Sequence, residues 1–92
     1  MHEPASDFWT DAGTCTTTPK RLKDESFPLK HYVVVRANNG NGKAICVGNS
    51  DCKNTGFILA AGVQTPLIPI NDINKVWVVS TEDEQGYSWI AL

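Results

Sequence analysis

Residues 75–92, KVWVVSTEDEQGYSWIAL, decide the fold class because they hold two short apolar runs around an acidic turn. Residues 75–80 are rich in valine, and residues 87–92 mix aromatic and aliphatic side chains, as β-strands do. The turn between them carries Glu82, Asp83 and Glu84 in succession. We predict a β-hairpin here, with the last run as a strand that completes a sheet or an interface.

Side-chain alternation divides this last strand into two faces. One face holds Tyr87, Trp89 and Ala91, and the other holds Ser88, Ile90 and Leu92. Large apolar groups therefore occur on both faces. This pattern predicts a surface that is buried against another chain, with Tyr87 and Trp89 as candidate interface residues.

A second hairpin is predicted from residues 31–48. Residues 31–37 form the most continuous β-branched run, which indicates a strand buried on both faces. Residues 38–42 read NNGNG, a strong turn signal, and residues 43–48 alternate as a returning strand would.

The rest of the chain completes an all-β pattern. We expect an edge strand at 14–18, a strand within 56–62, an extended edge at 63–70 that contains two prolines, and one helical turn at 71–74. About six short strands with no long helix predict a small antiparallel β-sandwich or barrel spanning residues 14–92.

Residues 1–13 show no strand or helix period and are predicted to be an extended N-terminal arm. Phe8 and Trp9 lie within this arm. The arm is either a frayed end that packs its two aromatic rings locally or a clamp that inserts them into a neighbouring subunit. If it is a clamp, removing residues 1–13 abolishes partner binding and leaves the fold intact.

Composition narrows the function classes. The net charge is -2 from 8 basic and 10 acidic residues, which argues against nucleic acid or an anionic membrane as a partner. The basic cluster of Lys20, Arg21, Lys23 and Lys30 is interpreted as a solvated edge. The chain begins without a signal-like apolar stretch and holds three cysteines, so we expect it to fold in a reducing cytoplasm.

The polar residues form no recognisable catalytic or metal-binding motif. His31 could be combined with Cys15 or Cys46 as a catalytic pair, or with Cys46 and Cys52 as a zinc site, but the spacing supports neither. Cys46 and Cys52 could also form a disulfide or pack as small buried side chains. We expect a protein that is not an enzyme and has no catalytic residue, metal or cofactor.

The sequence from Lys43 onward resembles small bacteriophage virion proteins. The resemblance rests on a strand followed by a Gly and Asn/Asp turn, Gly56-Phe57-x-Leu59-x-x-Gly62, an Asn/Asp corner at 71–74 and the closing strand at 86–92. It extends over roughly residues 14–92. Such proteins are short β-sandwiches encoded among head and tail genes, so the resemblance implies a structural component of a virion.

These observations lead to three functional hypotheses. The first is a capsid decoration or cement protein, a dimer or trimer that bridges major capsid subunits through interface residues Phe8, Trp9, Tyr87 and Trp89. The second is a tail, neck or fibre-base component of a virion assembled in the host cytoplasm. The third is a small carbohydrate- or ligand-binding module in which Trp9, Tyr87 and Trp89 stack on sugars.

Overall fold

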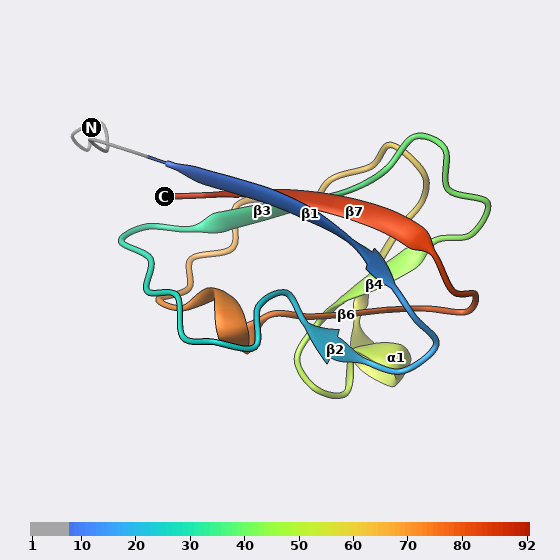
Figure 1. Ribbon diagram of the computed structural model, residues 1–92, viewed down its shortest axis with the longest axis horizontal. Coiled ribbons are helices and arrows are strands. Elements are labelled where there is room, and N and C mark those ends of the chain that lie inside the picture. The colour runs from blue at the N-terminus through green and yellow to red at the C-terminus, as the bar shows by residue number, and fades with distance from the viewer. Residues whose placement is uncertain (1–7) are drawn as a thin grey trace.

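The computed structural model describes residues 8–92, which alternate between two antiparallel sheets (Figure 1). Its elements are β1 (Trp9–Cys15), β2 (Lys20–Arg21), β3 (Val33–Ala37), β4 (Ile45–Gly48), α1 (Cys52–Thr55), β5 (Phe57–Leu59), the 3-10 turn η1 (Ile73–Lys75), β6 (Trp77–Ser80) and β7 (Gln85–Ala91). The all-β class and the two-sheet architecture are confirmed, with seven strands in this part of the chain rather than about six.

The first sheet has the order β1-β7-β3 and the second has the order β2-β6-β4-β5. The chain enters the first sheet, crosses to the second with β2, returns with β3, and crosses again with β4. It crosses once more between β6 and β7. This repeated crossing ties the two layers together along most of the sequence.

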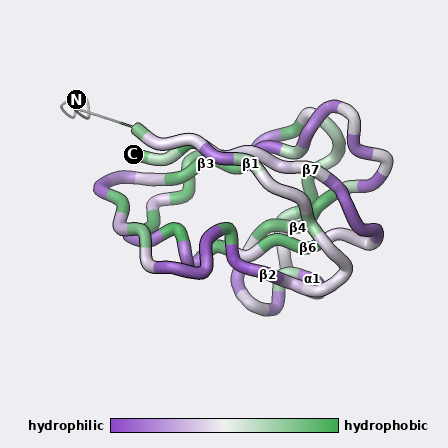
Figure 2. Tube along the Cα trace, in the orientation of Figure 1, coloured by the Kyte–Doolittle hydropathy of each residue, from purple (hydrophilic) through white to green (hydrophobic). Residues whose placement is uncertain are grey.

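The core lies between the inner faces of the two sheets. Alternate side chains of β3 and β7 point inward because successive residues of a strand face opposite sides. Figure 2 shows hydrophobic residues along β4 and β6, whereas the connection between β6 and β7 is hydrophilic. The buried inner-face residues are Cys15, Val33, Val35, Ala37, Tyr87, Trp89 and Ala91 from the first sheet, and Ile45, Val47, Leu59 and Val78 from the second.

Both predicted hairpins are wrong. β3 pairs with β7 in the first sheet, whereas β4 pairs with β5 and β6 in the second. β6 and β7 likewise lie in different sheets. β3 is also buried mainly on one face, since Arg36 is exposed and Val34 is half-buried on the other. Each supposed hairpin turn is therefore a connection between sheets.

Side-chain amides explain why the Asn-rich connection after β3 does not close a hairpin. The Asn41 side chain donates to the Gly86 carbonyl at 2.8 Å and accepts from the Gly86 N–H at 2.7 Å. The Gln85 side chain accepts from the N–H of Lys43 at 2.9 Å. The amide of Asn41 thus bonds to Gly86 as a strand residue would. These bonds hold the connection against the start of β7 instead of folding β4 back on β3.

The N-terminal arm also requires correction. Residues 9–13 belong to β1, which pairs with β7 from Trp9 opposite Ala91 to Cys15 opposite Gln85. The boundary predicted between residues 13 and 14 would therefore divide a strand of the sheet. The remainder of the predicted arm, residues 1–7, lies outside the described residues.

The extended edge expected at 63–70 is confirmed, and the helical turn expected at 71–74 is present at Ile73–Lys75. The segment after β5 runs beside β3 and bonds to it without forming a regular strand, as its prolines indicate. Thr65 replaces a main-chain partner there, because its hydroxyl accepts from the Val35 N–H at 3.0 Å while its own N–H donates to the Val35 carbonyl at 2.8 Å. Gly62 supplies the positive φ of 79° that turns the chain into this segment. The single helical turn is η1.

Asp72 fixes the corner that leads into η1. Its carboxylate accepts hydrogen bonds from the Ser26 hydroxyl, from the Phe27 N–H at 2.8 Å and from the Asn74 N–H at 3.0 Å. Hydrogen bonds to the ionised form, led by that from Ser26, lower the pKa of this carboxyl below 3.8.

We expect the stabilisation from Asp72 to depend on pH in one direction. Because the pKa is lower in the folded chain, the stabilisation is complete above about pH 4 and is lost as the pH falls through the folded pKa. The free energies of unfolding of the native chain and of Asp72→Asn, measured in urea, should differ at pH 7 and become equal at acid pH. Ser26→Ala should show a weaker acid dependence than the native chain. An equal difference in the free energy of unfolding between the native chain and Asp72→Asn at both pH values would contradict this role of Asp72.

Candidate interaction surfaces

The four predicted interface residues divide into two groups. Tyr87 and Trp89 are each 4% exposed and lie in the core, so their assignment to a surface that meets another chain was wrong. Phe8 and Trp9 are 58% and 38% exposed and remain candidates. The prediction that Tyr87, Trp89 and Ala91 share a face is confirmed, but that face is the interior of this chain.

Trp9 begins a row of aromatic rings that runs from the surface into the core. Its ring meets Phe27 edge-on at 5.5 Å, and Phe27 meets Trp89 edge-on at 6.1 Å. The Lys23 ammonium lies 5.3 Å from the Phe27 ring centre. These contacts hold Trp9 partly against its own chain, as the local-packing alternative for the arm expected. Phe8, which directly precedes β1, is the more exposed of the two.

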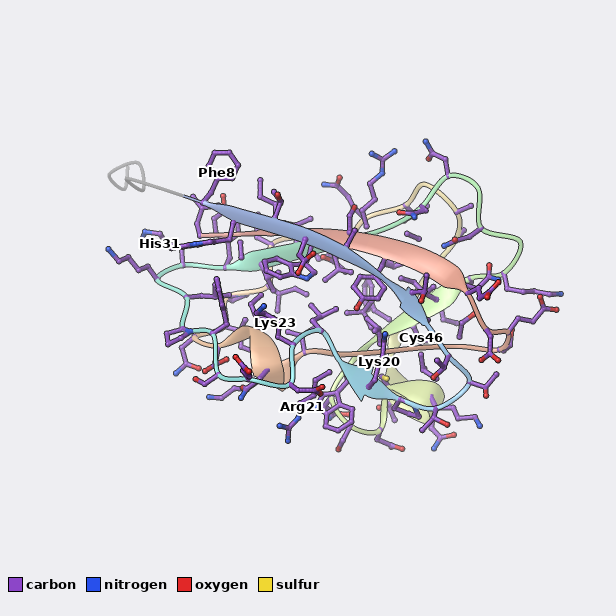
Figure 3. All side chains as sticks on the ribbon, viewed as in Figure 1. Phe8, Lys20, Arg21, Lys23, His31 and Cys46 are labelled. Atoms are coloured by element: carbon purple, nitrogen blue, oxygen red, sulfur yellow. The ribbon has the colours of Figure 1, made fainter. Side chains whose placement is uncertain are left out.

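The basic cluster makes contacts that the sequence did not indicate. Lys20 lies 5.8 Å from the Tyr87 ring centre, and the Arg21 guanidinium lies 5.2 Å from that of Trp77. Cations at this distance from an aromatic face stabilise the fold by about 0.5–1 kcal/mol at exposed sites. Figure 3 shows Lys20 and Arg21 on the opposite side of β1 from Phe8, so these two cations and Phe8 do not form one site.

An apolar groove forms a second surface, which sequence reasoning missed. It has a volume of about 340 Å³ and lies between β4 and β5 of the second sheet and the segment beside β3. Phe57, at the rim of the groove, is 62% exposed, whereas Ile58, the next residue of β5, is 71% exposed and lines a different pocket with Cys46 and Val79. Its apolar wall includes Val47, Phe57, Thr65, Pro66, Ile68 and Ile70.

The groove is suited to binding apolar groups rather than to catalysis. Residues 55–70 contain no Asp, Glu, Lys, Arg or His, and the one charged residue that lines the groove, Lys75, donates its ammonium to the Asn71 side chain at 2.8 Å. The one buried hydroxyl at the groove, that of Thr65, is engaged with the Val35 N–H. That uncharged run was the sequence signal from which an apolar surface could have been predicted.

The polar residues considered for catalysis or zinc are separated. His31 and Cys46 lie toward opposite ends of the molecule (Figure 3), and the N–H of His31 donates to the Leu92 carbonyl. Cys15, Cys46 and Cys52 are free thiols. Within residues 8–92, no group of three or more His, Cys, Asp or Glu side chains is placed to hold a metal ion.

Cys46 and Cys52 flank Gly56 at the closest approach of α1 to β4. A Cβ atom on Gly56 would lie 3.0 Å from the Cys52 Cβ and 3.1 Å from the Cys46 Cβ, and would overlap the Cys52 carbonyl oxygen. Only glycine fits this position without displacing α1. Cys52 is buried and Cys46 is half-buried.

We expect the buried thiols to be inert in the folded chain. Burial raises the pKa of Cys15 to about 11 and also raises the pKa of Cys52. Cys15 therefore stabilises the fold fully below about pH 9, where the unfolded thiol ionises, and this stabilisation is lost as the pH rises to about 11. Ellman's reagent at pH 8 should react first with Cys46, and with Cys15 and Cys52 only after urea is added. Rapid reaction of all three thiols without urea would contradict this.

The chain matches no protein-family model and no curated protein. No helix among residues 8–92 is long and apolar enough to cross a membrane. Its two exposed apolar surfaces, the start of β1 at Phe8 and the groove beside β5, are the candidate functional sites.

Proposed function

We propose that this protein is a non-enzymatic structural component of a bacteriophage particle, and specifically a capsid decoration or cement protein. The observation that supports this most is the exposure of large apolar side chains, Phe8, Phe57, Ile58 and Leu67, on a sandwich whose sheets are tied together by repeated crossings. Exposed apolar groups on a small stiff scaffold are typical of surfaces that other proteins cover. The resemblance of residues 43–92 to phage virion proteins supplies the biological setting.

In this proposal the protein acts by burying apolar area between neighbouring shell subunits. Each square ångström of apolar surface removed from water contributes about 25 cal/mol. Large aromatic side chains commonly carry a major share of binding energy at interfaces, which makes Phe8 the first anchor to test. Its partners would be the major capsid protein and other copies of this chain, with no nucleic acid, membrane or cofactor involved.

The test is the copy number of the protein in purified particles. Quantitative gel densitometry against the major capsid protein should give one-to-one or another fraction set by the capsid lattice. About a dozen copies per particle would overturn the cement assignment in favour of the tail, neck or fibre base. Absence from particles would overturn the virion assignment altogether.

A variant of Phe8 tests whether the end of β1 is the attachment point. Purified Phe8→Ser should bind undecorated capsids more weakly than the native chain in co-sedimentation. Thr14→Ser, an exposed position farther along β1, is the matched control and should bind as the native chain does.

The carbohydrate hypothesis is not proposed, because Tyr87 and Trp89 are buried and cannot stack on a sugar.

A further inference from the structure

β5 is an exposed edge of the second sheet. The order β2-β6-β4-β5 leaves one side of β5 without a neighbouring strand among residues 8–92. Two of its three residues, Phe57 and Ile58, are 62% and 71% exposed, and neither is charged. An edge with apolar side chains and unpaired main-chain groups is a template for pairing with another strand.

The other sheet edges carry features that oppose such pairing. On the edge of β1, the Asp11 carboxylate accepts from the N–H of Ala12 at 2.8 Å and so occupies that donor. β2 consists of only two residues, Lys20 and Arg21, and both are cationic. The free side of β3 is covered by residues 63–68, which bond to it. Short length, charged side chains and coverage are devices that keep sheet edges apart.

The charge distribution indicates which partner fits β5. A two-fold axis places each residue near its own equivalent, so any charge close to the axis meets a like charge. β5 itself contains no charged side chain, so an axis through it opposes apolar residues, whereas Lys53, which lines a pocket with Ile58, and Lys75, which lines the groove with Phe57, lie outside the strand. The same axis through β2 would oppose Lys20 and Arg21 to themselves. β5 is thus the edge at which this chain is compatible with its own copy.

We propose that β5 pairs in antiparallel orientation with β5 of a second copy, around a two-fold axis at Ile58. Phe57 then lies opposite Leu59 of the partner subunit, on the inner face, and the two Ile58 side chains meet on the outer face. The two four-stranded sheets join into one continuous sheet. The exposed Phe57 ring, at the rim of the groove, becomes covered by the second copy.

The area required shows that the strand pairing needs the surrounding surface. A standard stable interface buries about 800 Å² on each partner, which is roughly one seventh of the 5686 Å² surface of this chain. A three-residue ladder is too small to supply this area. The contact must therefore extend beyond the ladder, over exposed apolar side chains such as Phe57 and Ile58 on the two faces of β5 and Leu67 of the following segment.

Charge exchange at Ile58 tests the proposed axis directly. Sedimentation velocity of the full chain from micromolar to millimolar concentration should show a monomer–dimer equilibrium. Ile58→Lys and Ile58→Glu should each raise the dissociation constant on the order of 100-fold, because like charges meet at the axis. An equimolar mixture of the two variants should form a one-to-one heterodimer by native mass spectrometry. A cysteine at residue 58 is unsuitable as a probe because Ile58 pairs with Cys46.

Ile90→Lys is the matched control, since Ile90 is an exposed isoleucine on the outer face of β7 and should leave the dimer unchanged. Circular dichroism confirms that each variant is folded. If Ile58→Lys does not fold, amide hydrogen exchange of the native chain tests the pairing instead. The amides of residues 57–59 should then exchange more slowly at millimolar than at micromolar protein concentration. A native monomer at millimolar concentration, a trimer, or a dimer that persists in folded Ile58→Lys would overturn the proposal. These outcomes do not depend on the copy number in particles, so either proposal can fail without the other.

Discussion

Removal of residues 1–13 is expected to unfold the protein. The deletion takes five of the seven β1 residues away from β7 and exposes the inner face on which Tyr87 and Trp89 pack. Gly13 lies against the Tyr87 hydroxyl, where a Cβ atom would approach to 2.6 Å, so the contact is close along β1. A domain of this size has only about 5–15 kcal/mol of stability, which is too little to tolerate the loss of an edge strand that covers the core.

Circular dichroism and a thermal melt of the shortened chain measure this effect. The truncated protein should lack a cooperative transition, whereas Phe8→Ser should melt close to the native chain because that side chain is largely exposed. A cooperative melt retained by the truncated chain would restore the hypothesis of a separate arm. The truncation is therefore unsuitable as a test of partner binding, which requires point variants instead.

Trp89→Ala is expected to lower the free energy of unfolding by about 3–5 kcal/mol. Trp89 is 4% exposed on the central strand of the first sheet, and its ring contacts Phe27. Truncation removes that aromatic contact and leaves a cavity that the surrounding strands cannot close. Urea unfolding monitored by circular dichroism gives the difference directly.

Ile90→Ala is the control for this substitution, because Ile90 is the next residue on the same strand and faces outward with 38% exposure. It should lower the free energy of unfolding of the isolated chain by about 1 kcal/mol or less. Equal losses for the two variants would mean that the outer face of β7 is also buried in solution.

The fold class could be predicted from the sequence because side-chain alternation reports which residues share a face. Tyr87, Trp89 and Ala91 do share one, and Pro66 and Pro69 do mark an irregular edge. Alternation does not show which strands pair with each other, and both predicted hairpins were wrong. Residues 38–42 have the composition of a hairpin turn, but Asn41 uses its side chain to bind Gly86, 45 residues away.

The candidate surfaces, like the fold, could be predicted from the sequence only in part. From the sequence alone, an aromatic residue on the last strand could face either a partner or the core. In the structure the second sheet covers Tyr87 and Trp89, so both lie in the core. The groove was not predictable from any one motif because Val47, Phe57 and Ile68 come from three separate segments. The apolar character of most of its lining was visible in residues 55–70, although its shape was not.

The antiparallel register of β1 and β7 gives the protein a direction in which it resists force. Trp9 faces Ala91 at one end of the ladder, and Cys15 faces Gln85 at the other (Figure 1). Tension between Phe8 and the turn at residues 81–84 loads all seven residue pairs together in shear. Tension between the two ends that meet at Trp9 and Ala91 instead peels the pairs apart one after another. An attachment at Phe8 is therefore mechanically strong only when the opposing pull comes from the far end of the sandwich.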